Sequence, residues 1–114
     1  MKAILFAGQG SQQEKMGEDF YLSDSFAKDY YDKLDENLKE ILFEADLETI
    51  SQTENTQPAM IAYQTMISEM FKEDGVVFDY TAGLSIGEYA ALAHSEVITS
   101  EEAIEIAQIR GKLM

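Results

Sequence analysis

Cysteine is absent from this sequence, which also has no tryptophan, one proline and one histidine. The absence of cysteine excludes a disulfide framework and a thiolate metal site, and a single histidine excludes most imidazole-based metal sites. We therefore expect no metal in the functional site. A chain without cysteine also fits a cytoplasmic location.

Long hydrophobic runs are missing too. Lys2 precedes an apolar run of only residues 3–7, which is too short for the hydrophobic region of a signal peptide and far too short to span a bilayer. The run is therefore interpreted as a β-strand, and no membrane is expected among the partners.

Basic residues are scarce, with 8 Lys and Arg against 22 Asp and Glu and a formal net charge of -14. Nucleic-acid binding needs clustered Lys and Arg to neutralise phosphates, so this class of function is excluded. Thirteen of the acidic residues lie between Glu14 and Glu54, interleaved with apolar residues at helical spacing. We interpret them as the solvated faces of helices, which places any positive docking surface elsewhere.

The remaining pattern predicts a helix-rich chain. Its 114 residues and 46% hydrophobic content suit one globular unit. The first half is expected to hold a buried strand at 3–7, a surface helix after Ser23, a short apolar patch at 38–43 and a loop at 51–56. A helix at 59–72 follows, with Pro58 in its first turn and Gly75 as its stop. The rest is expected to form a buried strand that begins at Val76 and ends at 82–85, a helix directly after Ser85, and a helix from Ser100 with the capping-box spacing of Thr99 and Glu102.

Strands joined through helices pair in parallel, so we expect a layered α/β architecture. A sheet of only two strands is too small to pack against helices on both of its faces, as a layered α/β domain requires. The last helix is also still periodic at Met114, although Gly111 could cap it. Residues 1–114 are therefore interpreted as an incomplete domain.

The strongest local motif is Gly83-Leu84-Ser85-Ile86-Gly87, a G-x-S-x-G sequence between a predicted strand and a predicted helix. This is the context of a nucleophile elbow, in which a sharp turn presents the serine hydroxyl and the flanking glycines prevent collisions. The helix that follows favours developing negative charge at its first turn. The plainer alternative is a glycine-rich turn with a helix-capping serine.

A second glycine-flanked turn, Gly8-Gln9-Gly10-Ser11-Gln12, follows the first strand. Because parallel strands end at the same edge of a sheet, a backbone N–H of this turn can point into the same cleft as the elbow serine. Alone, the turn could equally be a phosphate-binding turn or a plain loop. It lacks the third glycine of a dinucleotide fingerprint and the lysine of a P-loop.

Together these segments resemble a known family. Residues 6–12 (FAGQGSQ), 56–59 (TQPA), 83–89 (GLSIGEY) and 110–114 (RGKLM) are similar to the ordered motifs of malonyl-CoA:acyl carrier protein transacylases and polyketide acyltransferase domains. The resemblance covers nearly the whole chain. It implies part of an α/β-hydrolase-like large subdomain with parallel strands and flanking helices, without the family's smaller ferredoxin-like subdomain.

The resemblance also implies roles for single residues. Ser85 would carry the malonyl group as an acyl-enzyme, the backbone N–H groups of Gln9 and Ile86 would form the oxyanion hole, and Arg110 would hold the malonyl carboxylate. Two further positions match the lining of the family's pocket, namely Gln57 and Met114. No cofactor would be bound, because coenzyme A enters as the thioester substrate and acyl carrier protein accepts the acyl group.

Two features depart from the family. Leu84 stands where the family often has histidine, which removes one local hydrogen-bonding side chain. The family's catalytic histidine lies far downstream of the position of Met114. His94 is a poor substitute because nine helical residues separate it from Ser85, roughly 13 Å along a helix axis.

The sequence therefore predicts transfer of a malonyl group from coenzyme A to the phosphopantetheine thiol of acyl carrier protein, in fatty acid or polyketide biosynthesis. The 114-residue chain by itself is expected to be inactive because its base is missing, and the C-terminal part of the same enzyme is expected as a partner. Two alternatives stay open: a serine esterase or lipase that uses the same elbow, and a non-catalytic binding fragment.

Overall fold

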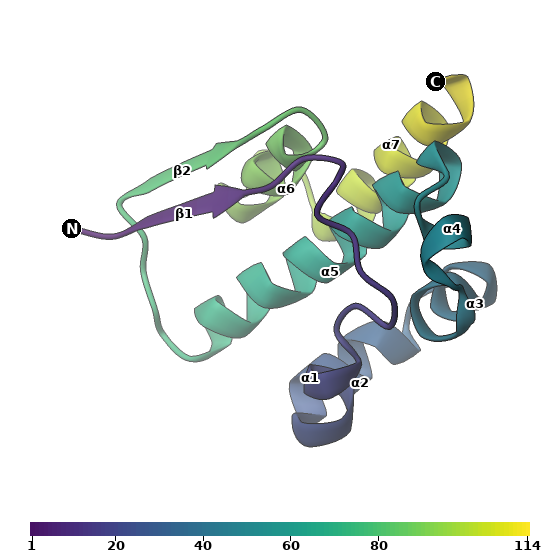
Figure 1. Cartoon of the computed structure of the whole chain (residues 1–114). Coiled ribbons are helices and arrows are strands. Elements are labelled where there is room, and N and C mark those ends of the chain that lie inside the picture. Colours follow the sequence, from purple (N-terminus) through teal and green to yellow (C-terminus); the bar gives the residue numbers. More distant parts are fainter.

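A computed structural model describes residues 1–114 as a small parallel sheet beside a larger body of helices (Figure 1). The elements, in chain order, are β1 Ala3–Phe6, α1 Glu18–Ser23, α2 Ser25–Asp32, α3 Glu36–Glu44, α4 Leu47–Ile50, α5 Thr53–Glu73, β2 Tyr80–Gly83, α6 Gly87–His94 and α7 Ser100–Leu113. This arrangement confirms the helix-rich α/β class predicted from the sequence.

The sheet consists of β1 and β2, which pair in parallel with Phe6 opposite Gly83. The chain between them runs through α1 to α5, the long crossover that parallel strands require. α6 packs against both strands, and Ile4 and Phe6 are buried whereas Leu5 is 75% exposed. The prediction of a fully buried first strand is therefore wrong, because helices cover only one face of the sheet (Figure 1).

The second strand begins later than the apolar pattern predicts. The pattern predicts a buried strand from Val76 that ends at 82–85, and β2 spans Tyr80–Gly83. The end is confirmed, but the start and the burial are wrong, because all four residues of β2 are exposed or half-buried. The Val76 N–H instead donates to the Phe71 carbonyl at 2.9 Å, and Gly75 before it has φ 76°, the geometry of a Schellman motif. Residues 76–79 therefore close α5 and lead to the sheet, and the predicted stop at Gly75 is confirmed.

α5 begins earlier than predicted. Polar residues 51–56 are expected to form a loop, but the helix starts at Thr53. The single O–H of the buried Thr56 lies within hydrogen-bond distance of the Ile50 and Gln52 carbonyls, which allows this polar stretch to lie in the first turns of a packed helix. Pro58 consequently lies beyond the first turn, so its predicted position at the helix start is wrong.

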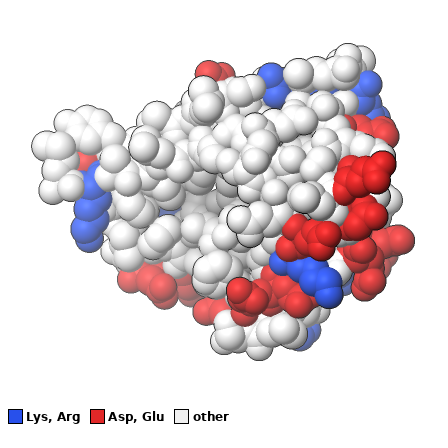
Figure 2. Space-filling model, viewed as in Figure 1, with Lys and Arg blue, Asp and Glu red and all other residues white.

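The acidic segment forms the short helices α1 to α4. Its aspartates do more than face solvent, because Asp24, Asp35 and Asp46 each accept a hydrogen bond from a backbone N–H at the start of α2, α3 or α4. The helix predicted after Ser23 is therefore α2, with Asp24 as its N-cap. Figure 2 shows most of the acidic side chains in view over the lower and right-hand parts of the molecule, where α1 to α4 lie, and few in its upper part.

α5 and α7 pack side by side. The predicted capping box is confirmed, with Thr99 and Glu102 exchanging hydrogen bonds at the start of α7. Gly111 is not a helix cap: it lies inside α7, where a Cβ would be 3.0 Å from the Glu54 Cα atom. A glycine there lets the two helices approach closely. None of the helices combines the length and the apolarity that crossing a bilayer requires.

Leu42 tests where the helical core lies. Its side chain in α3 is 0% exposed, whereas Leu47 at the start of α4 is 53% exposed. Leu42→Ala should leave a cavity and lower the free energy of unfolding by about 2–5 kcal/mol. Leu47→Ala, the matched control, should lower it by no more than about 1 kcal/mol. Denaturant titration followed by circular dichroism measures both, and equal losses would contradict this packing.

Candidate active site

Ser85 lies in the sharp turn between β2 and α6. Its backbone has φ 54°, in the left-handed region, and its side chain is exposed. A Cβ at Gly83 would lie 2.1 Å from the Gly87 carbonyl oxygen, and a Cβ at Gly87 would lie 2.3 Å from the Phe6 carbonyl oxygen. Only glycine fits at these two positions, and a non-glycine residue held at positive φ is typical of a functional turn.

The simpler interpretation of Ser85 as a helix cap does not fit this geometry. The residue that precedes the first turn of α6 is Ile86, and no side chain caps that helix. The serine hydroxyl is therefore left exposed beside a helix N-terminus. This is the arrangement that a nucleophilic serine needs.

The turn after β1 contacts the elbow directly. A Cβ at Gly8 would lie 2.9 Å from the Leu84 carbonyl oxygen, and the Leu84 N–H donates to the Phe6 carbonyl at 3.0 Å. The main chain of Leu84 makes these contacts, while its side chain is 72% exposed. Leu84 therefore joins the two turns through its backbone.

Two backbone donors in these turns are unpaired. Neither the Gln9 N–H nor the Ile86 N–H takes part in a backbone–backbone hydrogen bond. Both belong to turns that meet at the carboxyl ends of the parallel strands. Unpaired N–H groups beside a nucleophile can stabilise a negatively charged oxygen, the chemistry of acyl transfer.

Side chains of α5 anchor the turn after β1. The Gln9 side chain donates to the Thr53 hydroxyl at 3.1 Å, and Gln64, which is 7% exposed, donates to the Ala7 carbonyl at 2.8 Å. Sequence reasoning missed Gln64. The only signal was a long amide side chain within the apolar stretch of α5.

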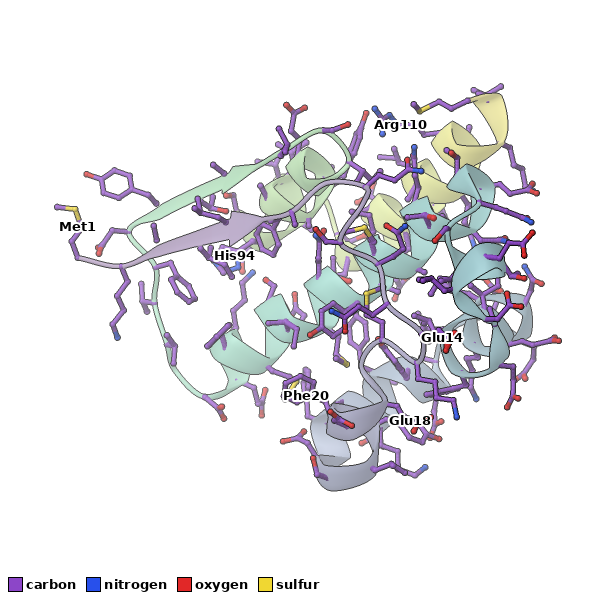
Figure 3. The ribbon with its side chains drawn as sticks, viewed as in Figure 1. Met1, Glu14, Glu18, Phe20, His94 and Arg110 are labelled. Atoms are coloured by element: carbon purple, nitrogen blue, oxygen red, sulfur yellow. The ribbon has the colours of Figure 1, made fainter.

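Arg110 brings three predicted residues together at the end of α7. Its Nη1 donates to the Gln57 Oε1 at 3.2 Å, and the Gln57 Nε2 donates to the Met114 Sδ at 3.1 Å. The Arg110 guanidinium also lies 5.8 Å from the ring centroid of Tyr89 in α6, a contact that sequence reasoning missed. Figure 3 shows Arg110 reaching from α7 toward the turn that precedes α6.

His94, the only histidine, is engaged away from the elbow. Its Nδ1 lies 2.6 Å from the Ser68 hydroxyl, and its ring packs against Phe6 and Phe78. Figure 3 shows it between the sheet and α5. Burial, and then the charge of Lys72, lower its pKa from the ordinary 6.5. The imidazole thus serves packing, in line with the sequence-based expectation that it does not activate Ser85.

Comparison with known proteins identifies related chains. The family model described as the acyl transferase domain matches residues 4–114. The malonyl CoA-acyl carrier protein transacylase of Bacillus subtilis (strain 168) is 39% identical over 116 residues, which cover 98% of this chain and 37% of that protein. The protein of the same name from Staphylococcus aureus (strain MRSA252) is 34% identical with the same coverage. The chain thus spans about 37% of the length of these curated relatives.

Solved structures of similar proteins share the fold. The malonyl CoA-acyl carrier protein transacylase of Clostridium perfringens matches with a TM-score of 0.89 and 34% identity, over 100% of this chain and 38% of the other. The acyltransferase domain from the second module of the salinomycin polyketide synthase matches with a TM-score of 0.91 and 34% identity, over 99% and 28%. A type II polyketide malonyl-transacylase, solved in complex with its acyl-carrier protein, matches with a TM-score of 0.87 and 33% identity, over 97% and 38%.

The half-buried setting of His94 predicts a pH dependence of stability. Because the folded pKa is lowered from 6.5, the unfolded chain takes up a proton at a higher pH than the folded chain does. The free energy of unfolding should therefore fall as the pH is lowered from 6.5 toward the folded pKa. Well above pH 6.5 the imidazole is neutral in both states, so His94 should add no pH dependence there.

His94→Gln isolates this contribution from that of the carboxylates. Wild type and variant are compared by denaturant titration between about pH 7.5 and pH 5. The wild type should lose more stability than the variant over this range. A difference between the two that stays constant with pH would show that His94 titrates normally.

Proposed function

Because the chain belongs to the acyl transferase domain family, we propose that it forms the part of a malonyl-CoA:acyl carrier protein transacylase that carries the nucleophile. The observation that carries the proposal is Ser85 at φ 54°, exposed between two glycines that no larger residue could replace. Residues 1–114 would form part of an α/β-hydrolase-like large subdomain. The names of the relatives support fatty acid or polyketide biosynthesis as the setting.

In the first step, the Ser85 Oγ attacks the thioester carbonyl carbon of malonyl-CoA. A C–O bond forms, the C–S bond breaks, and coenzyme A leaves as its thiol with the proton that the serine gives up. The carbonyl oxygen carries negative charge during the attack. The unpaired N–H groups of Gln9 and Ile86 would stabilise it, and one such donor is typically worth roughly 2.7–4 kcal/mol.

In the second step, the phosphopantetheine thiol of acyl carrier protein attacks the Ser85 ester. A C–S bond forms, the ester C–O bond breaks, and the proton of the incoming thiol passes to the Ser85 Oγ. Both steps need a base to accept the proton and return it. His94 is held by Ser68, so we propose that the base is a histidine outside residues 1–114. The relatives are long enough to supply one, since the chain covers 37% of their length.

Arg110 would select the acyl group. A guanidinium can bind a carboxylate through two parallel hydrogen bonds, and an acetyl group offers no carboxylate. The Arg110 guanidinium makes only one hydrogen bond within the chain, from Nη1 to Gln57. The other donors are therefore free for a dicarboxylic acyl unit such as malonyl.

The nucleophile is tested by mass spectrometry after incubation of the complete protein with malonyl-CoA. A malonyl adduct is expected on the peptide that contains Ser85 and should be lost in Ser85→Ala. Ser95→Ala, an exposed serine just after α6, is the matched control and should keep the adduct. Absence of an adduct in the wild type would sink the proposal, and faster hydrolysis of neutral esters than malonyl transfer would favour an esterase.

Acyl selection is tested with Arg110→Gln. Lys112→Gln, which removes an exposed cation two residues away, is the matched control. Loss of a charge-assisted carboxylate contact should lower kcat/KM for malonyl-CoA roughly 10- to 150-fold. The acetyl group has no carboxylate for the arginine to bind, so kcat/KM for acetyl-CoA relative to malonyl-CoA should rise. Steady-state transfer to acyl carrier protein measures both substrates. An equal fall with malonyl-CoA and acetyl-CoA would remove Arg110 from substrate selection.

A further inference from the structure

The Arg110 side chain is held on two sides by residues of other helices. Gln57 in α5 accepts a hydrogen bond from its Nη1 at 3.2 Å, and the Tyr89 ring in α6 lies 5.8 Å from its guanidinium carbon. A long side chain at the end of a helix has many rotamers. These two contacts restrict it to one region, beside the first turn of α6 (Figure 3).

Gln57 acts through Arg110 and not on a substrate. Its side chain is 1% exposed, and both ends of its amide are occupied, one by Arg110 and the other by Met114. One N–H and one lone pair of the amide remain unused, but the burial of the side chain keeps them out of reach of a ligand. It therefore fixes one edge of the guanidinium.

The Arg110 guanidinium carbon lies over the Tyr89 ring, a contact that uses none of the guanidinium N–H donors. Tyr89 lies in the first turns of α6, four residues after Ser85. The start of that helix cannot shift freely, because Gly87 is packed against the Phe6 carbonyl. The Tyr89 ring thus holds the Arg110 guanidinium against the same helix start that follows Ser85.

We propose that Tyr89 is a positioning residue that orients Arg110 toward an acyl group on Ser85 and so contributes to the preference for dicarboxylic acyl units. The proposal rests on the proposed function. The ring restricts the guanidinium before substrate arrives, so less conformational freedom is lost when a carboxylate binds. The benefit applies only to substrates that carry such a carboxylate.

The test compares Tyr89→Leu, which removes the ring, with Tyr89→Phe, which keeps it. In the complete protein, Tyr89→Leu should raise KM for malonyl-CoA roughly three- to thirtyfold, the size expected for a partly desolvated cation–π contact. The change should fall on KM more than on kcat, and acetyl-CoA should show no matching rise. Tyr89→Phe should restore the malonyl preference because the contact is made by the ring.

Leu92→Ala is the matched control for general damage to α6. Leu92 is 39% exposed, and its aliphatic side chain can form neither a hydrogen bond nor a cation–π contact with Arg110. Thermal unfolding of all variants separates lost stability from lost selection. Equal KM values for wild type and Tyr89→Leu, or equal losses in Tyr89→Phe and Tyr89→Leu, would overturn the inference. A wild type that takes up no malonyl group would instead overturn the proposed function.

Discussion

The close backbone approach between the turn after β1 and the turn after β2 is the constraint on which the site depends. Gly8, Gly83 and Gly87 each bring main-chain atoms closer than a Cβ would allow. This contact forces Ser85 to φ 54° and turns its side chain outward. Strain of this kind persists only where the surrounding structure determines the backbone, and here two paired strands and a packed helix do so.

α5 is the element that brings the remaining parts of the site to this turn. Two of its buried glutamines form hydrogen bonds with other segments: Gln64 donates to the Ala7 carbonyl, and Gln57 accepts from Arg110. Gly111 allows α7 to approach the start of α5 closely enough for the second contact. Each of these hydrogen bonds also orders the site, although the Oε1 of Gln64 is buried without a partner.

Charge is divided between two parts of the molecule. Most of the acidic residues in view gather over α1 to α4, where aspartates cap helices, while the upper part of the face shown in Figure 2 carries few of them. An anionic thioester or an acidic carrier protein would meet little repulsion on that face. The strongly negative net charge is therefore compatible with the proposed partners, because charge acts through its position as well as its sum.

The sequence by itself determined the local elements and the motif. Apolar periodicity and caps were enough for α7 and most of α5, and the glycine spacing was enough to predict the elbow at Ser85, because these features depend on neighbours along the chain. The tertiary structure alone decided which face of β1 is buried, where β2 begins, and that polar residues 53–56 are helical. It also decided that Tyr89, Gln57 and Arg110 meet, since that contact joins three helices whose packing no local pattern encodes.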